Sequence, residues 1–112
     1  MNDVLTVSVA RDRGVPVVTA IGEVDVSTAP LLRDGLLGVP ADEPLVVVDL
    51  SEVTFLDSTG ISVLVAARKR ALGASVRLVV TRPQIAKVLE VTGLASQFEV
   101  VAARREALPA RS

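Results

Sequence analysis

The sequence predicts a single α/β domain, built on a mixed sheet of about five strands that about four helices cover. Apolar residues repeat along the chain with the period of strands and with the period of helices in turn. The first two strand-like segments are joined by a short polar loop, whereas a helix-like segment precedes each later one. The later strands are therefore expected to run parallel through right-handed crossovers. We expect residues 1–112 to form one domain with its core at about 4–108.

A hairpin is predicted at the start of the chain. Residues 4–10 and 15–21 alternate between apolar and polar side chains, which is the period of a half-buried strand. The polar loop between them ends at Gly14, a residue type that tolerates positive φ. Pro16 removes a ladder hydrogen bond, so we expect it near the start of its strand or on an edge.

Helical and strand-like segments then alternate. Ser27 and Thr28 are candidate N-caps of a helix with Pro30 in its first turn and its end near Gly38. Residues 45–50 are apolar apart from Asp49, as in a central strand covered on both faces. The further predicted elements are a helix over 61–72 that stops at Gly73, a strand over 76–80, a helix from Pro83 to Gly93 with Thr81 and Gln84 at capping-box spacing, a strand over 98–101 and a helix over 102–108.

The composition excludes several classes of function. The chain has no Cys and no His, so a thiol nucleophile, an imidazole base and a His/Cys zinc site are absent, and a Ser-His-Asp hydrolase is ruled out. The net charge of −1 and the presence of only two Phe argue against nucleic-acid binding. No apolar run reaches the roughly 20 residues of a membrane span, and the N-terminus lacks the layout of a signal peptide. We expect a soluble, cytoplasmic protein without a cofactor or metal.

Residues 55–60, Phe-Leu-Asp-Ser-Thr-Gly, form the segment with the clearest functional chemistry. They place two hydroxyls beside a carboxylate and a glycine where a strand is expected to turn into a helix. Such a turn is exposed and presents backbone N–H groups, so its side chains are available to a partner. The plain interpretation is an N-cap, since Asp, Ser and Thr are preferred there. A capping turn can also be a phosphorylation site, so the two interpretations coexist.

Asp49 and the two phenylalanines have simpler interpretations. An aspartate that ends a buried strand is also the phosphoacceptor position of response-regulator receivers, which carry an acidic cluster after their first strand. Here the first strand ends at the basic Arg11, and the initial hairpin breaks the alternating order of a receiver. We therefore expect Asp49 to have a capping or turn role. Phe55 and Phe98 are expected in the core.

Three motifs together resemble those of STAS domains, and most closely those of bacterial anti-sigma factor antagonists. They are Gly22-Glu23-Val24-Asp25, Val48-Asp49-Leu50-Ser51 leading to the segment at 55–60, and Thr92-Gly93-Leu94. The order of elements is similar from about Val4 to Leu108. The resemblance implies a STAS-like domain that switches partners. Its unphosphorylated form binds a serine-protein kinase that doubles as an anti-sigma factor, which frees a sigma factor. Phosphorylation by that kinase ends binding, and a metal-dependent serine phosphatase restores it.

Carried onto this chain, the resemblance places the phosphate acceptor at Ser58. Thr59 stays an alternative, because physical chemistry does not discriminate adjacent hydroxyls. A phosphate beside Asp57 adds about −1.5 to −2 charges, so we expect modification to weaken binding rather than refold the domain. The plain interpretation of Glu23 and Asp25 is solvated charge near the start of a helix. The residues that the resemblance places in or beside the docking surface are Asp57, Ser58, Thr59, Gly60, Glu23, Asp25, Ser27 and Thr28.

Two functions of other classes stay open. One is a STAS regulatory subunit of a transporter or a stress-sensing complex in which no kinase acts on the serine. The other is a small enzyme that uses Asp57 and Ser58, although the chain lacks a glycine-rich phosphate loop. We predict a binding protein rather than an enzyme.

Overall fold

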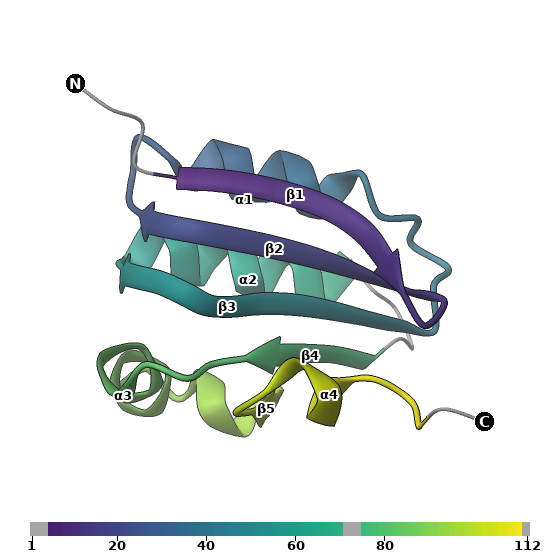
Figure 1. Cartoon of the computed structure of the whole chain (residues 1–112). Helices are drawn as coiled ribbons and strands as arrows, with labels where there is room; N and C mark the ends of the chain where they lie inside the picture. The colour runs from purple at the N-terminus through teal and green to yellow at the C-terminus, as the bar shows by residue number, and fades with distance from the viewer. Residues whose placement is uncertain (1–4, 71–74, 111–112) are drawn as a thin grey trace.

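Five strands form one mixed sheet in the computed structural model, which describes residues 5–70 and 75–110 (Figure 1). The strands lie in the order β1-β2-β3-β4-β5, with β1 antiparallel to β2 and every other pair parallel. This arrangement confirms the predicted α/β class and its initial hairpin. The elements are β1 (Leu5–Asp12), β2 (Val15–Val24), α1 (Ala29–Leu37), β3 (Leu45–Leu56), α2 (Ser58–Arg70), β4 (Ser75–Val79), α3 (Pro83–Val91), a 3-10 helix (Leu94–Ser96), β5 (Glu99–Val101) and α4 (Arg104–Ala107).

The hairpin turns through two residues with positive φ, Arg13 at 51° and Gly14 at 78°. Two such residues make the tight turn whose twist matches that of the flanking strands. Pro16 is the second residue of β2, near the start of the strand as predicted. Pairing of β2 with β3 begins only at Val17. The missing N–H of Pro16 therefore costs the β2–β3 ladder nothing.

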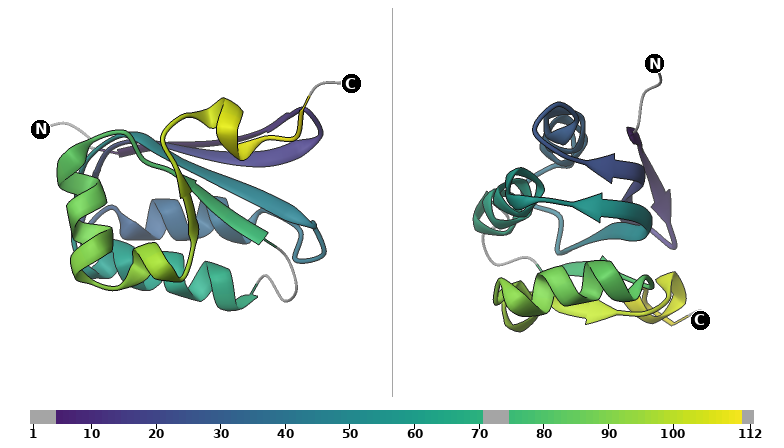
Figure 2. Two further views of the ribbon diagram at one scale, coloured as in Figure 1. Left: turned by 90° about the horizontal axis from the view of Figure 1, so that it is seen from below. Right: turned by 90° about the vertical axis from the view of Figure 1, so that its left-hand side faces the viewer.

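Helices cover both faces of the sheet. Figure 2 shows α1 and α2 against one face and the short α4 on the opposite face. The larger core lies under α1, α2 and α3, where Leu32, Leu64 and Leu89 pack against β3 residues such as Val48 and Leu50. A smaller core lies under α4 and contains Val15, Val17, Val47, Val79, Ala107 and Leu108. Central strands covered on both faces explain the continuous apolar run of β3.

Strand β3 ends at Leu56 rather than at Leu50, the end that the sequence predicts. It pairs with β4 only as far as Asp49, whereas its pairing with β2 continues to Leu56. A parallel neighbour thus extends the strand past the end of its apolar run. The carboxyl ends of β2 and β3 consequently lie side by side beyond the end of β4 (Figure 1).

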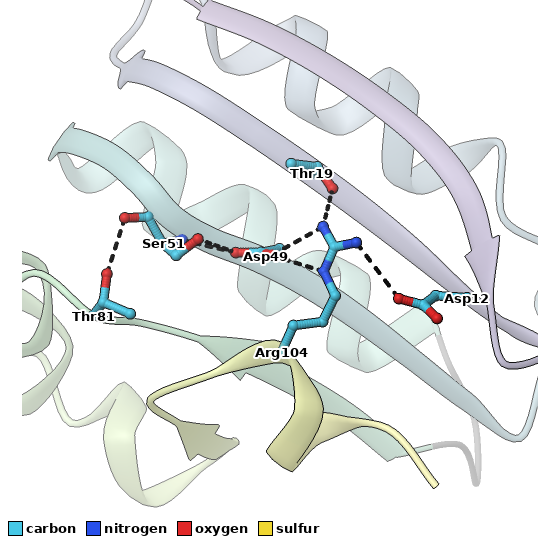
Figure 3. A network of polar contacts seen from close by, with 6 residues as sticks. All are labelled: Asp12, Thr19, Asp49, Ser51, Thr81 and Arg104. Atoms are coloured by element: carbon cyan, nitrogen blue, oxygen red, sulfur yellow. Dashed lines mark hydrogen bonds and ion pairs between the residues drawn. The ribbon is translucent and has the colours of Figure 1, made fainter. Parts of the chain in front are cut away.

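Asp49 lies inside β3, so the predicted capping or turn role is corrected. Asp49 is only 5% exposed, and its Oδ2 accepts a hydrogen bond of 3.0 Å from Arg104 Nε (Figure 3). Its Oδ1 accepts the N–H of Ser51 at 2.9 Å, where the register between β2 and β3 shifts. Arg104 also donates to Thr19 Oγ1 at 3.0 Å and pairs with Asp12 at 3.7 Å. The buried charge is therefore paired, and Arg104 fastens α4 to the sheet.

The predicted capping box at the start of α3 is wrong. The Thr81 hydroxyl donates instead to the carbonyl of Ser51 at 3.0 Å, and Arg82 holds the N-cap position. Gly93 has a φ of 82° just after α3, which suits the predicted helix stop. The predicted stop of α2 at Gly73 lies outside the described residues, as do Ala71 and Leu72. The predicted terminal helix is shorter than 102–108, since α4 spans only Arg104–Ala107.

Candidate functional site

Two loops meet at the carboxyl ends of β2 and β3. Glu23 pairs with Phe55 and Val24 with Leu56 in the last part of the ladder. The N–H of Asp57 then donates to the carbonyl of Val24 at 3.2 Å. The segment that follows β2 and the turn between β3 and α2 therefore form one continuous region. Both groups of residues predicted for the docking surface belong to it.

Asp57 caps helix α2. Its carbonyl accepts the N–H of Ile61 at 3.1 Å, and its Oδ1 accepts the N–H of Thr59 at 2.9 Å and of Gly60 at 3.4 Å. The Thr59 hydroxyl donates to the same oxygen. These donors hold the pKa of Asp57 below its usual range, the Thr59 hydroxyl contributing most. The capping interpretation of the turn is thus confirmed, and Asp57 is a carboxylate at neutral pH.

The two adjacent hydroxyls of the turn differ in their surroundings. Ser58 is exposed, and its Oγ makes no hydrogen bond to any residue that the structure describes. Thr59 is partly buried, and its hydroxyl is bound to Asp57. Of these two hydroxyls, only that of Ser58 is both exposed and without a hydrogen bond among the described residues.

Gly60 is buried and lets α2 approach the sheet closely. A Cβ at this position would lie 2.7 Å from Val24 Cγ1 and closer still to Leu56 Cδ1. Real Cβ atoms do not approach neighbours so closely, because packed interiors leave no room for overlap. Gly60 thus allows the start of α2 to pack directly on Val24 and Leu56, and it has no side chain that could contact a partner.

The loop after β2 is held by Asp25 and Thr28. Asp25 Oδ1 accepts the N–H of Ser27 at 2.9 Å and of Thr28 at 3.0 Å. The Thr28 hydroxyl donates to the carbonyl of Glu23 at 2.8 Å, and the residue is only 8% exposed. Thr28, one of the two predicted N-cap candidates, occupies the N-cap position of α1, but its side chain makes no cap hydrogen bond. The Asp25 side chain binds the turn before the helix. Buried Thr28 fixes the loop, whereas Ser27 on the loop and Glu23 near the end of β2 are exposed.

Phe55 is a surface residue that the sequence analysis misplaced. It is 48% exposed beside the turn, and Val26 on the neighbouring loop is 70% exposed, whereas Phe98 lies in the core as predicted. The longer β3 explains the error. Near its end Phe55 pairs with the exposed Glu23 and is itself exposed, whereas the next residue, Leu56, is buried where α2 approaches the sheet at Gly60. Exposed aromatic side chains are common anchors of protein interfaces.

The region is acidic as well as partly apolar. Residues 20–28 and 51–62 contain Glu23, Asp25, Glu52 and Asp57 and no Lys or Arg. Within residues 5–70 and 75–110, no group of three or more His, Cys, Asp or Glu side chains is placed to hold a metal ion. In the same part of the chain, no helix is long and apolar enough to cross a membrane.

The fold and this turn define a domain of the STAS class, and the chain belongs to the STAS domain family, whose model matches residues 6–107. The anti-sigma-F factor antagonist RsfB of Mycobacterium tuberculosis is 38% identical over 109 residues, which cover 95% of this chain and 88% of RsfB. The crystal structure of an anti-sigma factor antagonist from Mycobacterium paratuberculosis is 32% identical with a TM-score of 0.87, and covers 92% of this chain and 90% of that one. The phosphorylated form of the Bacillus cell-fate determinant SpoIIAA shares the fold, with a TM-score of 0.65 and 16% identity. The match covers 90% of this chain and 96% of SpoIIAA.

Proposed function

We propose that this protein is an anti-sigma factor antagonist with a phosphorylation switch at Ser58. Its unphosphorylated form binds an anti-sigma factor serine kinase and so frees a sigma factor in the cytoplasm. The names of RsfB and of the Mycobacterium paratuberculosis protein support this class of function. The observation that carries the switch is the exposed, unbonded hydroxyl of Ser58 on a capped turn within an acidic surface. The protein acts by binding and performs no catalysis of its own.

The geometry favours Ser58 over Thr59 as the acceptor. In the transfer, Ser58 Oγ bonds to the γ-phosphorus of ATP, the bond to the ADP oxygen breaks, and a base of the kinase takes the hydroxyl proton. Thr59 would have to surrender its hydrogen bond to Asp57 first, which would weaken the cap of α2. Ser58 takes part in no such bond, so the kinase can use it without disturbing the helix.

A phosphate at Ser58 would act on binding more than on folding. Helix N-termini usually bind anions favourably, because their first N–H groups lack hydrogen-bond partners. Here the Asp57 carboxylate already accepts the N–H groups of Thr59 and Gly60, so these groups are less available to bind a phosphate. The phosphate would add about −1.5 to −2 charges beside Asp57 and near Glu23. A partner that packs on this surface would have to desolvate these like charges together, so it dissociates. A metal-dependent phosphatase would then restore the binding form.

The exposed residues around Ser58 supply the rest of the proposed docking surface. Phe55 and Val26 offer apolar contact, and Glu23 and Ser27 offer polar contact at the rim. Gly60 and Thr28 border this surface from the interior. A complementary partner would present basic side chains around an apolar recess.

The test is affinity capture from a lysate of the native host with four baits, followed by mass spectrometry. The baits are the wild type, Ser58→Ala, Ser58→Glu and Ser96→Glu. Ser96 is an exposed serine of the 3-10 helix that does not belong to the proposed docking surface, and Ser96→Glu adds the same charge there. We expect the wild type, Ser58→Ala and Ser96→Glu to retain a small ATP-binding serine kinase and Ser58→Glu to lose it. Retention of the same transporter or sensor proteins by all four baits would contradict the switch and indicate a regulatory subunit instead.

A further inference from the structure

A cleft of about 190 Å³ lies between the C-terminal halves of α1 and α2, next to the start of β3. Figure 2 shows these two helices side by side on one face of the sheet. Leu36, Val39, Val46, Val63 and Ala67 give the cleft mostly aliphatic walls. An apolar cavity of roughly 150 Å³ is large enough to bind benzene, so this cleft can hold a somewhat larger apolar group.

The cleft is remote from the turn that carries Ser58. Ser58 is the first residue of α2, whereas the α2 residues that line the cleft begin at Val63 and end at Arg70, 5 and 12 residues further along it (63 − 58 and 70 − 58). At about 1.5 Å per residue, these positions lie roughly 8 and 18 Å along the helix axis. The cleft is therefore a separate site, and its ligand does not depend on the proposed switch.

Two arginines line the cleft. Arg70 Nη1 donates to the carbonyl of Val39 at 3.1 Å, and no carboxylate within the described residues lies at ion-pair distance from Arg70. Among residues 5–70 and 75–110, Arg33 pairs only with the exposed carboxylate of its neighbour Asp34, at 3.4 Å. Such an exposed contact is weak and is screened by solvent. Both guanidinium groups thus keep donors for an anionic ligand.

Glu43 is the one acidic residue in the lining, and it is already paired. Its carboxylate accepts hydrogen bonds from Arg11, which does not line the cleft. This contact holds the pKa of Glu43 below its usual range, the hydrogen bond from Arg11 being the main cause. Because Arg11 balances Glu43, the positive charges of Arg33 and Arg70 dominate the polar part of the cleft.

We propose that this cleft binds a small amphiphilic anion, a carboxylate with an unbranched chain of about six to eight carbons. The chain would lie against the leucine, valine and alanine side chains, and the carboxylate would meet Arg33 and Arg70. Arginine suits this role, because its planar fork of donors matches the two oxygens of a carboxylate. Apart from Arg33, Arg70 and the paired Glu43, the described lining is apolar, which favours an apolar chain over a polar metabolite.

The test is a titration of the ¹⁵N-labelled full chain with octanoate below its micellar concentration, followed by amide chemical shifts. We expect saturable shifts at the cleft, an affinity that rises roughly fourfold per methylene from hexanoate to octanoate, and binding at least tenfold weaker for the uncharged 1-octanol. Ala66→Leu, which fills the cleft from its exposed side, should abolish these shifts. Arg33→Gln should weaken octanoate binding at least threefold, whereas Arg68→Gln, at an exposed arginine of α2 outside the cleft, should not.

Several results would overturn the proposal. They are shifts that do not saturate or that spread over the whole surface, equal affinities for octanoate and 1-octanol, and equal effects of Arg33→Gln and Arg68→Gln. Circular dichroism of each variant shows whether it is folded. If Ala66→Leu is not folded, Arg33→Gln and the 1-octanol comparison decide the question without it.

Discussion

The Thr59 hydroxyl donates a hydrogen bond to the Asp57 carboxylate, and Ser58 between these two residues keeps its own hydroxyl exposed. The Asp57 carboxylate therefore caps α2 and also binds the Thr59 hydroxyl, which would otherwise compete with Ser58 as a phosphate acceptor. A turn with two chemically similar hydroxyls thus offers only one of them to a partner. This arrangement gives the proposed switch a single acceptor and leaves the helix cap intact when that acceptor is modified.

Asp57→Asn tests the charge of the cap. The pKa of Asp57 is lowered in the folded state, so its stabilising effect is fully present above the unfolded pKa of about 3.9 and is lost as the pH falls through the lower folded pKa. We expect the Tm of Asp57→Asn to be a few degrees below that of the wild type at pH 7, with the difference shrinking below about pH 4. Thermal unfolding followed between pH 3 and 7 measures it. A difference that stays constant over this range would rule out the charge as its cause.

Gly60→Ala tests the close contact beneath the turn. The new Cβ would overlap side-chain atoms of Leu56 and Val24, so we expect a loss of about 1–3 kcal/mol in the free energy of unfolding. Gly38→Ala is the matched control, because its Cβ would meet no atom nearer than 3.4 Å and its φ is −72°. Urea unfolding compares the two variants. Equal stabilities of Gly60→Ala and Gly38→Ala would mean that α2 shifts away from the sheet without cost.

Arg104→Ala tests the attachment of α4. Asp49 Oδ2 would lose its charged donor inside the sheet, while Oδ1 would keep Ser51. We expect a loss of about 1–3 kcal/mol, the cost of leaving a buried acceptor without a partner. Arg105→Ala removes the same side chain from an exposed neighbour and should change stability by less than about 0.5 kcal/mol. Chemical denaturation measures both variants. If Arg104→Ala were as stable as the wild type, the packing of Ala107 and its hydrogen bond from Arg77 would suffice to hold α4 without Arg104.

Phe55→Ala tests the apolar part of the proposed docking surface. Because the side chain is half exposed, its removal should change stability little but weaken kinase binding by at least about tenfold. Val91→Ala trims another exposed apolar residue, 72% exposed at the end of α3, and should leave binding unchanged. Surface plasmon resonance with the kinase as analyte compares the variants. If both variants bind like the wild type, Phe55 lies outside the interface.

The order of helices and strands could be predicted from the sequence, because each of these elements depends on local sequence signals. The alternation in β1 and β2, the caps and the continuous apolar run of β3 each predict one element from adjacent residues. The sequence also predicts the start of α2 at the turn, because Asp57 caps within three residues of itself. Such short-range hydrogen bonds can be inferred from residue type and spacing.

The errors share a different cause, which is contact between residues far apart in the chain. Asp49 bonds to Arg104, 55 positions away, so no local pattern could identify it as part of an ion pair. Thr81 likewise bonds to Ser51 rather than capping its own helix. Phe55 lies on the part of β3 that pairing with β2 extends past the end of β4, and its side chain is exposed there although that of Leu56 is buried. The meeting of the segment after β2 with the turn between β3 and α2 depends on that same long-range pairing.

The affinity of the chain for the purified anti-sigma factor kinase of its host, with and without phosphoserine at position 58, tests the proposed switch most directly. Isothermal titration calorimetry would compare the unmodified protein, the protein with phosphoserine at position 58 and the unmodified Ser58→Ala variant. We expect the unmodified protein and Ser58→Ala to bind alike, and the phosphorylated form to bind at least about tenfold more weakly while keeping its circular dichroism spectrum. Equal affinities of the phosphorylated and unmodified forms would contradict the switch at Ser58.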